Sequence, residues 1–213
     1  MKIYLKSDDL RFAYLKEWLS KKHSIVNDIE NAECIILDFK ESSIPKNIKN
    51  DTLVISYKPM QIENNYSLID SEAFLKKNAY LTALATIKQL DTINKKIIIY
   101  GNGRIASYLH QFLKDCIILA RHPKGDQKDI NSKDYIDADI IINTIPAKLP
   151  IDYNLLKENV RIVDLASFPY GFDHTLLKEL GIDIELYSSL PGKFYPKEAG
   201  YILYEEVMRC LKV

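Results

Sequence analysis

This 213-residue chain lacks an excess of either charge and any long apolar run. Lysine plus arginine number 29, as do aspartate plus glutamate, so there is no overall positive charge to attract nucleic acid or an anionic membrane. No apolar run approaches the roughly 20 residues of a membrane helix, and Asp8 and Asp9 come too early for a signal peptide. We therefore expect a cytoplasmic protein that binds neither nucleic acid nor membrane.

Cysteine and histidine are also scarce, with three cysteines and four histidines. Cys34 and Cys116 lie within apolar runs of the kind that form buried strands, where free thiols are common. The histidines show no metal-ligand spacing, and the sequence has neither a hydrolase nucleophile motif nor the phosphate-loop lysine motif. These absences argue against a disulfide framework, a metal site, and a hydrolase or kinase function.

Short runs of Ile, Leu and Val alternate with amphipathic stretches, which is the pattern of βα units around a largely parallel sheet. Residues 1–92 predict a small flavodoxin-like lobe with a connecting helix over about 71–90. Residues 93–213 predict a Rossmann-type domain that ends in a helix over about 196–211. The strands expected in this domain cover 96–100, 116–120, 139–144, 160–165 and 182–187. We thus expect a two-lobed α/β protein.

A glycine motif follows the first strand of the predicted Rossmann-type domain. Its residues, G-x-G-x-x-A, are Gly101, Asn102, Gly103, Arg104, Ile105 and Ala106. Gly101 permits a tight turn, Gly103 lets a pyrophosphate approach the backbone, and Ala106 allows the next helix to pack closely on the strand. Free amides and the positive end of that helix would face the phosphates. The motif predicts dinucleotide binding through residues 101–105, with a purely structural turn as the alternative.

The end of the second strand indicates which dinucleotide is bound. In NAD-binding domains an acidic residue about 20 positions after the glycines grips the ribose 2′-hydroxyl. Here Arg121 and His122 stand at that place, and no carboxylate does. Because arginine pairs with the extra phosphate of NADP, NADP is the expected cofactor. The alternative is that Arg121 is only a solvated residue at a strand end.

The loops after the later strands carry the other candidate site residues, because ligands of open α/β sheets bind beyond the carboxyl ends of the strands. These loops mix small, polar and turn-forming residues, which leave backbone groups free. The cofactor contacts expected there are Asn143, Thr144, Ile145, Pro146 and Ala166. The contacts expected for an anionic substrate are Ser167, Gly192, Lys193 and Lys197, although the lysines are equally compatible with plain solvent exposure.

The same segments resemble the A subunit of dipicolinate synthase, the enzyme that makes pyridine-2,6-dicarboxylate for bacterial spores. The resemblance covers most of residues 95–212. It rests on DIIINTIPA at 139–147, IVDLAS at 162–167, LPGK at 190–193, and the pairs Pro196-Lys197 and Ala199-Gly200. In the first lobe, Asp9 and Arg11 are similar to the end of the family's Gly-Gly-Asp-x-Arg segment.

The chain departs from the family pattern in three places. Its first lobe is shorter by some tens of residues. The family's Pro-Thr-Ala-Glu-Gly reads Leu81-Thr82-Ala83-Leu84-Ala85, and its Pro-Gly-Gly reads Pro169-Tyr170-Gly171. These departures affect the substrate side more than the cofactor side.

The resemblance implies NADP-dependent oxidation of a dihydrodipicolinate, formed by water loss from 4-hydroxy-tetrahydrodipicolinate. It also implies a partner, the flavoprotein-like B subunit, and a homo-oligomer is a further expectation. Arg11, Lys193 and Lys197 would hold the two carboxylates, while the catalytic base has no candidate. Two alternatives stay open. One is a shikimate-dehydrogenase-like enzyme, which usually needs a lysine and aspartate pair not evident here. The other is a regulatory subunit that binds NADP without turnover, which Leu84, Ala85 and Tyr170 favour.

Overall fold

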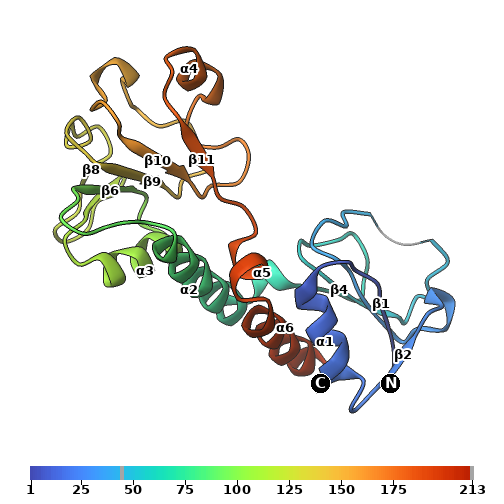
Figure 1. The fold of residues 1–213 in the computed structure, drawn as a ribbon. Helices are drawn as coiled ribbons and strands as arrows, with labels where there is room; N and C mark the ends of the chain where they lie inside the picture. Colours follow the sequence, from blue (N-terminus) through green and yellow to red (C-terminus); the bar gives the residue numbers. More distant parts are fainter. Residues whose placement is uncertain (44–45, 212–213) are drawn as a thin grey trace. The chain divides into compact units, whose positions relative to one another are not determined.

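The computed structural model describes residues 1–43 and 46–211, and the chain divides into two compact units. The first unit combines Met1–Leu81 with the chain from Pro191 onward, and the second is Thr82–Leu190. Figure 1 shows the helices and strands of both. The division falls within one helix, α2 (Glu72–Lys88), and at the start of another, α5 (Leu190–Phe194).

The first unit contains a parallel sheet in which the described residues form five strands in the order β2-β1-β3-β4-β5. The strands are β1 (Lys2–Leu5), β2 (Ser24–Val26), β3 (Cys34–Ile36), β4 (Leu53–Ser56) and β5 (Asn65–Ser67). This is the flavodoxin-like strand order, so the fold predicted for the first lobe is confirmed. The edge strands β2 and β5 had no sequence signal because they are three residues long and mostly only half-buried.

Helices cover one face of this sheet. In Figure 1, α1 (Leu10–Leu19) lies beside α6 (Pro196–Cys210). Leu15 from α1 and Leu203 from α6 are buried in the same cluster as Ile3 of β1. Loops and the short 3₁₀ helix Ile29–Asn31 pack against the other face. The helices α1 and α6 thus lie on one face of this sheet, and the loops with the short 3₁₀ helix lie on the other.

The position of α6 corrects the domain boundary expected from the sequence. The pattern of alternating strands and helices placed this last helix in the Rossmann-type domain, whereas it packs on α1 in the first unit. Gly200 makes this contact close, because a Cβ there would lie 2.7 Å from the carbonyl oxygen of Arg11. The amphipathic pattern identified a helix, but such a pattern does not identify the sheet that the helix covers.

The second unit contains a six-stranded parallel sheet in the order β11-β10-β9-β6-β7-β8. The strands are β6 (Ile97–Tyr100), β7 (Ile117–Ala120), β8 (Lys128–Asp129), β9 (Ile140–Asn143), β10 (Arg161–Asp164) and β11 (Ile184–Leu186). Counted along this unit, the order is 6-5-4-1-2-3, which is that of Rossmann dinucleotide-binding domains, and the predicted fold class is confirmed. Of these strands, only β8 lies outside the ranges expected from the sequence.

Alternate residues of β6 face opposite sides of the second sheet. Ile97 and Ile99 pack toward α3 (Arg104–Leu113), while Ile98 and Tyr100 pack toward the 3₁₀ helix Tyr153–Leu155 and α4 (His174–Glu179). Both faces are therefore covered, which explains why these strands read as continuous apolar runs.

Within residues 1–43 and 46–211 no helix combines the length and apolarity needed to cross a bilayer. The three cysteines are free. Over the same residues, no group of three or more His, Cys, Asp or Glu side chains is arranged to hold a metal ion.

Candidate functional site: the carboxyl edge of the second sheet

The loop between β6 and α3 is shaped by its two glycines. Gly101 has φ +112°, a conformation that residues with a side chain rarely adopt, and a Cβ there would lie 2.3 Å from Thr144 Oγ1. Gly103 is different, because a Cβ there would have no described atom within 4 Å apart from its own local backbone and chain neighbours. The first glycine is thus required by internal packing, whereas the second leaves open space beside the backbone.

The amino terminus of α3 opens onto this space. Gly103 is the residue that caps the helix, and it has no side chain that could accept a hydrogen bond from the first amides. The first amides of a helix have no partners within the helix, and together with the helix dipole they favour an anion. Ala106 of α3 is fully buried in the same cluster as Ile97 and Ile99 of β6, as close packing of this helix on the strand requires.

The loop after β9 forms the other side of the switch in strand order between β6 and β9. Thr144 donates two hydrogen bonds to the Tyr100 carbonyl oxygen, from its backbone nitrogen at 3.0 Å and from Oγ1 at 2.8 Å. Ile145 is half-buried and Pro146 is exposed. In sheets of this topology, ligands bind in the crevice at this switch point.

Asn143 was expected to contact the cofactor, but the structure gives its side chain an internal role. It is fully buried, and its Nδ2 donates to the Ile145 carbonyl oxygen at 3.0 Å and to Asp164 Oδ1 at 2.8 Å. Its Oδ1 accepts from the Ile145 backbone nitrogen at 2.8 Å. The amide therefore ties the loop after β9 to the end of β10.

Asp164, the last residue of β10, organises the next loop. Its carboxylate is fully buried and accepts from the backbone nitrogens of Ala166 at 2.9 Å and Gly171 at 3.1 Å, in addition to Asn143. The chain passes so close at Gly171 that a Cβ there would lie 2.2 Å from Asn143 Nδ2. The expected cofactor residue Ala166 is buried, while Ser167, assigned to the substrate, is exposed.

The predicted NADP-selecting residues lie at the end of β7. Arg121 and His122 are exposed, and Arg121 forms no ion pair with any described residue. Asn102 Nδ2 donates to the His122 carbonyl oxygen at 2.9 Å, which joins the glycine loop to this strand end. The second unit thus brings together the residues predicted at 101–105, Arg121, His122, residues 143–146, Ala166 and Ser167 along one edge of the sheet.

The remaining predicted substrate residues belong to the first unit. Arg11 is 8% exposed, and its guanidinium already pairs with Asp9, with Nε 2.9 Å and Nη2 2.5 Å from carboxylate oxygens. It also lies 4.3 Å from the centre of the Phe39 ring. The hydrogen bond from Arg11 is the main cause that holds the pKa of Asp9 below its usual value. Arg11 is therefore charge-balanced within the chain.

Gly192 is required by its approach to Arg11, because a Cβ at Gly192 would lie 2.7 Å from Arg11 Nε. Lys193 of α5 and Lys197 of α6 are exposed and form no ion pair with any residue of the described chain. The first unit thus carries two exposed cations, Lys193 and Lys197, that no described carboxylate balances. They follow Gly192, which packs against the buried Arg11.

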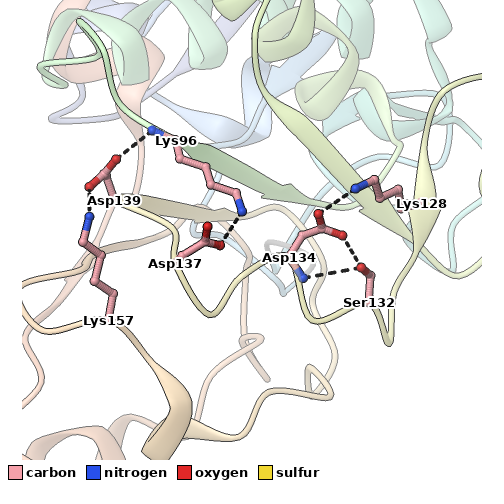
Figure 2. Close-up of polar contacts among 7 residues, drawn as sticks. All are labelled: Lys96, Lys128, Ser132, Asp134, Asp137, Asp139 and Lys157. Atoms are coloured by element: carbon pink, nitrogen blue, oxygen red, sulfur yellow. Dashed lines mark hydrogen bonds and ion pairs between the residues drawn. The ribbon is translucent and has the colours of Figure 1, made fainter.

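The opposite, amino edge of the second sheet carries paired charges (Figure 2). Asp139, which precedes β9, accepts from the Lys96 backbone nitrogen at 2.8 Å and from Lys157 Nζ at 2.5 Å. Asp137 pairs with Lys96 Nζ. The hydrogen bond from Lys157 is the largest cause that lowers the pKa of Asp139, and the one from Lys96 does the same for the pKa of Asp137.

Two residues at the carboxyl edge were not predicted as site residues. His174, the first residue of α4, faces Asp164, and Tyr170 stacks on its ring at 4.9 Å between ring centres. Tyr170 has φ +66°, in the left-handed region that favours glycine. The sequence signal that could have drawn attention to them is Tyr170 itself, which stands where the resembling family has glycine.

Comparisons with known proteins agree with this geometry. No family model matches the chain. A stretch of 78 residues is 38% identical to the A subunit of dipicolinate synthase of Bacillus subtilis (strain 168), covering 35% of this chain and 26% of that protein. The match thus spans about a quarter of the relative's length.

Two solved structures extend the comparison to the whole fold. The A subunit of dipicolinate synthase from Bacillus subtilis matches with a TM-score of 0.81 at 18% identity, over 100% of this chain and 96% of that one. An NADPH-dependent glyoxylate/hydroxypyruvate reductase from Sinorhizobium meliloti matches with a TM-score of 0.52 at 10% identity, over 98% and 93% of the two chains. The predicted resemblance to the A subunit of dipicolinate synthase is confirmed, in one segment by sequence and over the whole chain by fold.

Proposed function

We propose that this protein is an NADP-dependent dehydrogenase that oxidises a dihydrodipicolinate to dipicolinate. The observation that carries the proposal is the switch in strand order between β6 and β9, where the open side of Gly103 at the start of α3 lies beside an internally braced loop. The residues fit a dinucleotide: exposed amides suit a pyrophosphate, and Arg121 is free to pair with a 2′-phosphate.

The chain's own residues would mainly bind and orient. When bound, oxidised NADP supplies the hydride acceptor, and the protein holds the substrate ring against it. Hydride loss from the dihydropyridine ring completes an aromatic pyridine, so the oxidation itself is favourable. The rigid network of Asn143 and Asp164 keeps the loops after β9 and β10 in place without reorganisation.

Two carboxylates on the substrate call for cations. Lys193 and Lys197 are exposed and unpaired among the described residues, and they are the proposed carboxylate ligands. Arg11 uses Nε and Nη2 to bind Asp9, which leaves Nη1 as the donor it could offer. The lysines therefore carry more of this proposal than Arg11 does.

The decisive experiment titrates purified protein with NADPH and with NADH, using the quench of protein fluorescence and the cofactor's own emission. Oxidised NADP and enzymatically generated 4-hydroxy-tetrahydrodipicolinate are then added, and the absorbance of the pyridine product is followed. We expect tighter binding of NADPH than NADH and formation of dipicolinate. No binding of either nucleotide would overturn the proposed cofactor site.

A second candidate function is an NADP-binding regulatory subunit without turnover. It is favoured by Leu84 and Ala85, which replace the glutamate and glycine of the resembling family, and by Tyr170. Tight NADPH binding with no pyridine formed, even when a flavoprotein-like B subunit is supplied, would select it. Co-purification of the two chains tests that partner directly.

A further inference from the structure

His174 has one buried and one accessible side. Its Nε2 is buried, forms no hydrogen bond to any described residue and lies 3.7 Å from Asp164 Oδ2. The side chain as a whole is nevertheless 32% exposed, whereas that of Asp164 is fully buried. The imidazole therefore turns one nitrogen toward a buried carboxylate, while about a third of the side chain is exposed to solvent.

The carboxylate that faces His174 is rigidly held. Asp164 accepts from Asn143 Nδ2 and from the backbone nitrogens of Ala166 and Gly171, so its orientation is over-determined. A neutral histidine has one N–H donor and one acceptor nitrogen. A carboxylate beside Nε2 favours the tautomer with the proton on that atom, and the acceptor is then Nδ1.

Tyr170 packs against one face of the His174 imidazole. Its ring stacks on that of His174 with an interplanar angle of 24°, while its backbone has a φ of +66°, which is unfavourable for a bulky residue. Residues held in such conformations cluster at functional sites, where surrounding structure maintains them. The unfavourable conformation is accompanied here by the stack on His174, which helps to stabilise it.

The position of His174 suits a proton acceptor for the proposed oxidation of a dihydrodipicolinate. Asp164 ends β10 at the same edge of the sheet as Gly101 and Gly103, with only β9 between β10 and β6. A histidine oriented by a carboxylate is the usual arrangement for a general base. Besides Asp164, the ionisable groups near it include Tyr170 on its ring and Asp173, which precedes it. They also include Tyr153, whose hydroxyl accepts from the Asp173 backbone nitrogen at 2.9 Å.

We propose that Nδ1 of His174 takes the proton released when the substrate is oxidised, with Asp164 and Tyr170 as positioning residues; this rests on the proposed dehydrogenase function. The dihydropyridine ring loses two electrons and two hydrogens. One hydrogen leaves with the electron pair as hydride to oxidised NADP, and the other leaves as a proton to His174, which later passes it to water.

The first test uses His174→Gln and His174→Ala, with His110→Gln of α3 as the matched control. Loss of a general base is expected to lower kcat for dipicolinate formation by about 10²–10⁴-fold. It should also remove the fall in rate toward acid pH, with NADPH affinity unchanged. Free imidazole should restore part of the rate of His174→Ala, which a purely structural role would not allow.

The second test needs neither cofactor nor substrate. Long-range ¹H–¹⁵N spectra of the ¹⁵N-labelled protein should show His174 as the Nε2–H tautomer, and Asp164→Asn should change that signal. If Asp164→Asn does not fold, Tyr170→Gly serves instead. It relieves the unfavourable backbone, so it should fold at least as well as the wild type while altering the His174 signal and lowering kcat.

Three results would overturn the proposal: a wild-type rate and pH profile in His174→Gln, no rescue of a slow His174→Ala by imidazole, or the Nδ1–H tautomer in the wild type. An active wild type with an equally active His174→Gln removes only the role of His174. A wild type that binds NADPH but forms no dipicolinate removes the proposed function as well.

Discussion

The two edges of the second sheet differ in how their polar groups are used. At the amino edge, Asp137 and Asp139 are each matched by a lysine, so these charges are balanced within the chain (Figure 2). At the carboxyl edge, Arg121 is unpaired among the described residues and α3 begins without a side-chain cap. Paired charges hold strands together, whereas unbalanced charges and open amides are available to a ligand.

The carboxyl edge also has two layers, a buried hydrogen-bonded pair of side chains and the exposed loop residues above it. The buried pair Asn143 and Asp164 is fully hydrogen-bonded, and it supports loops whose outer residues Pro146 and Ser167 are exposed. A buried polar network is destabilising unless every polar atom in it has a hydrogen-bond partner. Each side-chain nitrogen and oxygen of Asn143 and Asp164 has one. The comparison teaches that the exposed loops of the carboxyl edge rest on an internal frame, the buried pair Asn143 and Asp164. Substitutions in this frame and at the exposed surface should therefore have different effects.

Gly101 and Gly103 offer the sharpest separation of these effects. Gly101→Ala places a Cβ 2.3 Å from Thr144 Oγ1 in a backbone with φ +112°. The free energy of unfolding should fall by about 1–3 kcal/mol from overpacking, and further because of the backbone conformation. NADPH affinity should fall strongly as well. Gly103→Ala meets open space, so it should lower the urea midpoint less than Gly101→Ala does, while it also loses NADPH affinity. Urea unfolding and NADPH titration of both variants measure this. Unfolding data that rank them in the reverse order would contradict the packing described.

Gly171→Ala tests the frame itself. Its Cβ would lie 2.2 Å from Asn143 Nδ2, which is held at 2.8 Å from Asp164 Oδ1, so the amide must move or the loop must shift. We expect a loss of about 1–3 kcal/mol in the free energy of unfolding, measured by chemical denaturation. Gly103→Ala again serves as the control glycine. An unchanged midpoint in Gly171→Ala would show that the network is not a rigid frame.

Arg121→Ala tests the open surface at the end of β7. We expect at least a ten-fold loss of NADPH affinity, equivalent to about 1.4 kcal/mol, because the 2′-phosphate loses its charge partner. NADH affinity and the free energy of unfolding should stay as they are, since Arg121 is exposed and pairs with no described residue. Isothermal titration with both nucleotides decides this, and equal NADPH affinity in the variant removes Arg121 from the site.

The smallest effect is expected at the amino edge. Asp139→Asn keeps an acceptor for the Lys96 backbone nitrogen but removes the charge that faces Lys157. Because the folded protein lowers the pKa of Asp139, its charge stabilises the fold above the ordinary value of 3.8, and this contribution is lost as the pH falls through the lowered pKa. Urea midpoints of wild type and variant should differ slightly at pH 7 and converge as the pH falls through the lowered pKa of Asp139. NADPH affinity should not change, because this edge is opposite the glycine loop.

Several parts of the fold were predictable because their signals are local. The strands β6, β7, β9 and β10 are apolar runs, and the loop at Gly101 follows one of them, so each could be recognised from a few consecutive residues. The edge strands β2, β5 and β8 escaped recognition since they have two or three residues each and lack apolar runs. Asn143 was placed at the right edge of the sheet but assigned to the cofactor rather than to the frame.

The sequence by itself determined the two kinds of α/β unit, the glycine loop and the basic end of β7, because periodicity and turn chemistry are properties of neighbouring residues. Only the tertiary structure decided that α6 packs in the first unit, that Asn143 and Asp164 join beneath the loops, and that His174 faces Asp164. These contacts join residues ten or more positions apart in the sequence. Which of them form depends on the order of the strands in each sheet and on the close backbone packing that glycines permit.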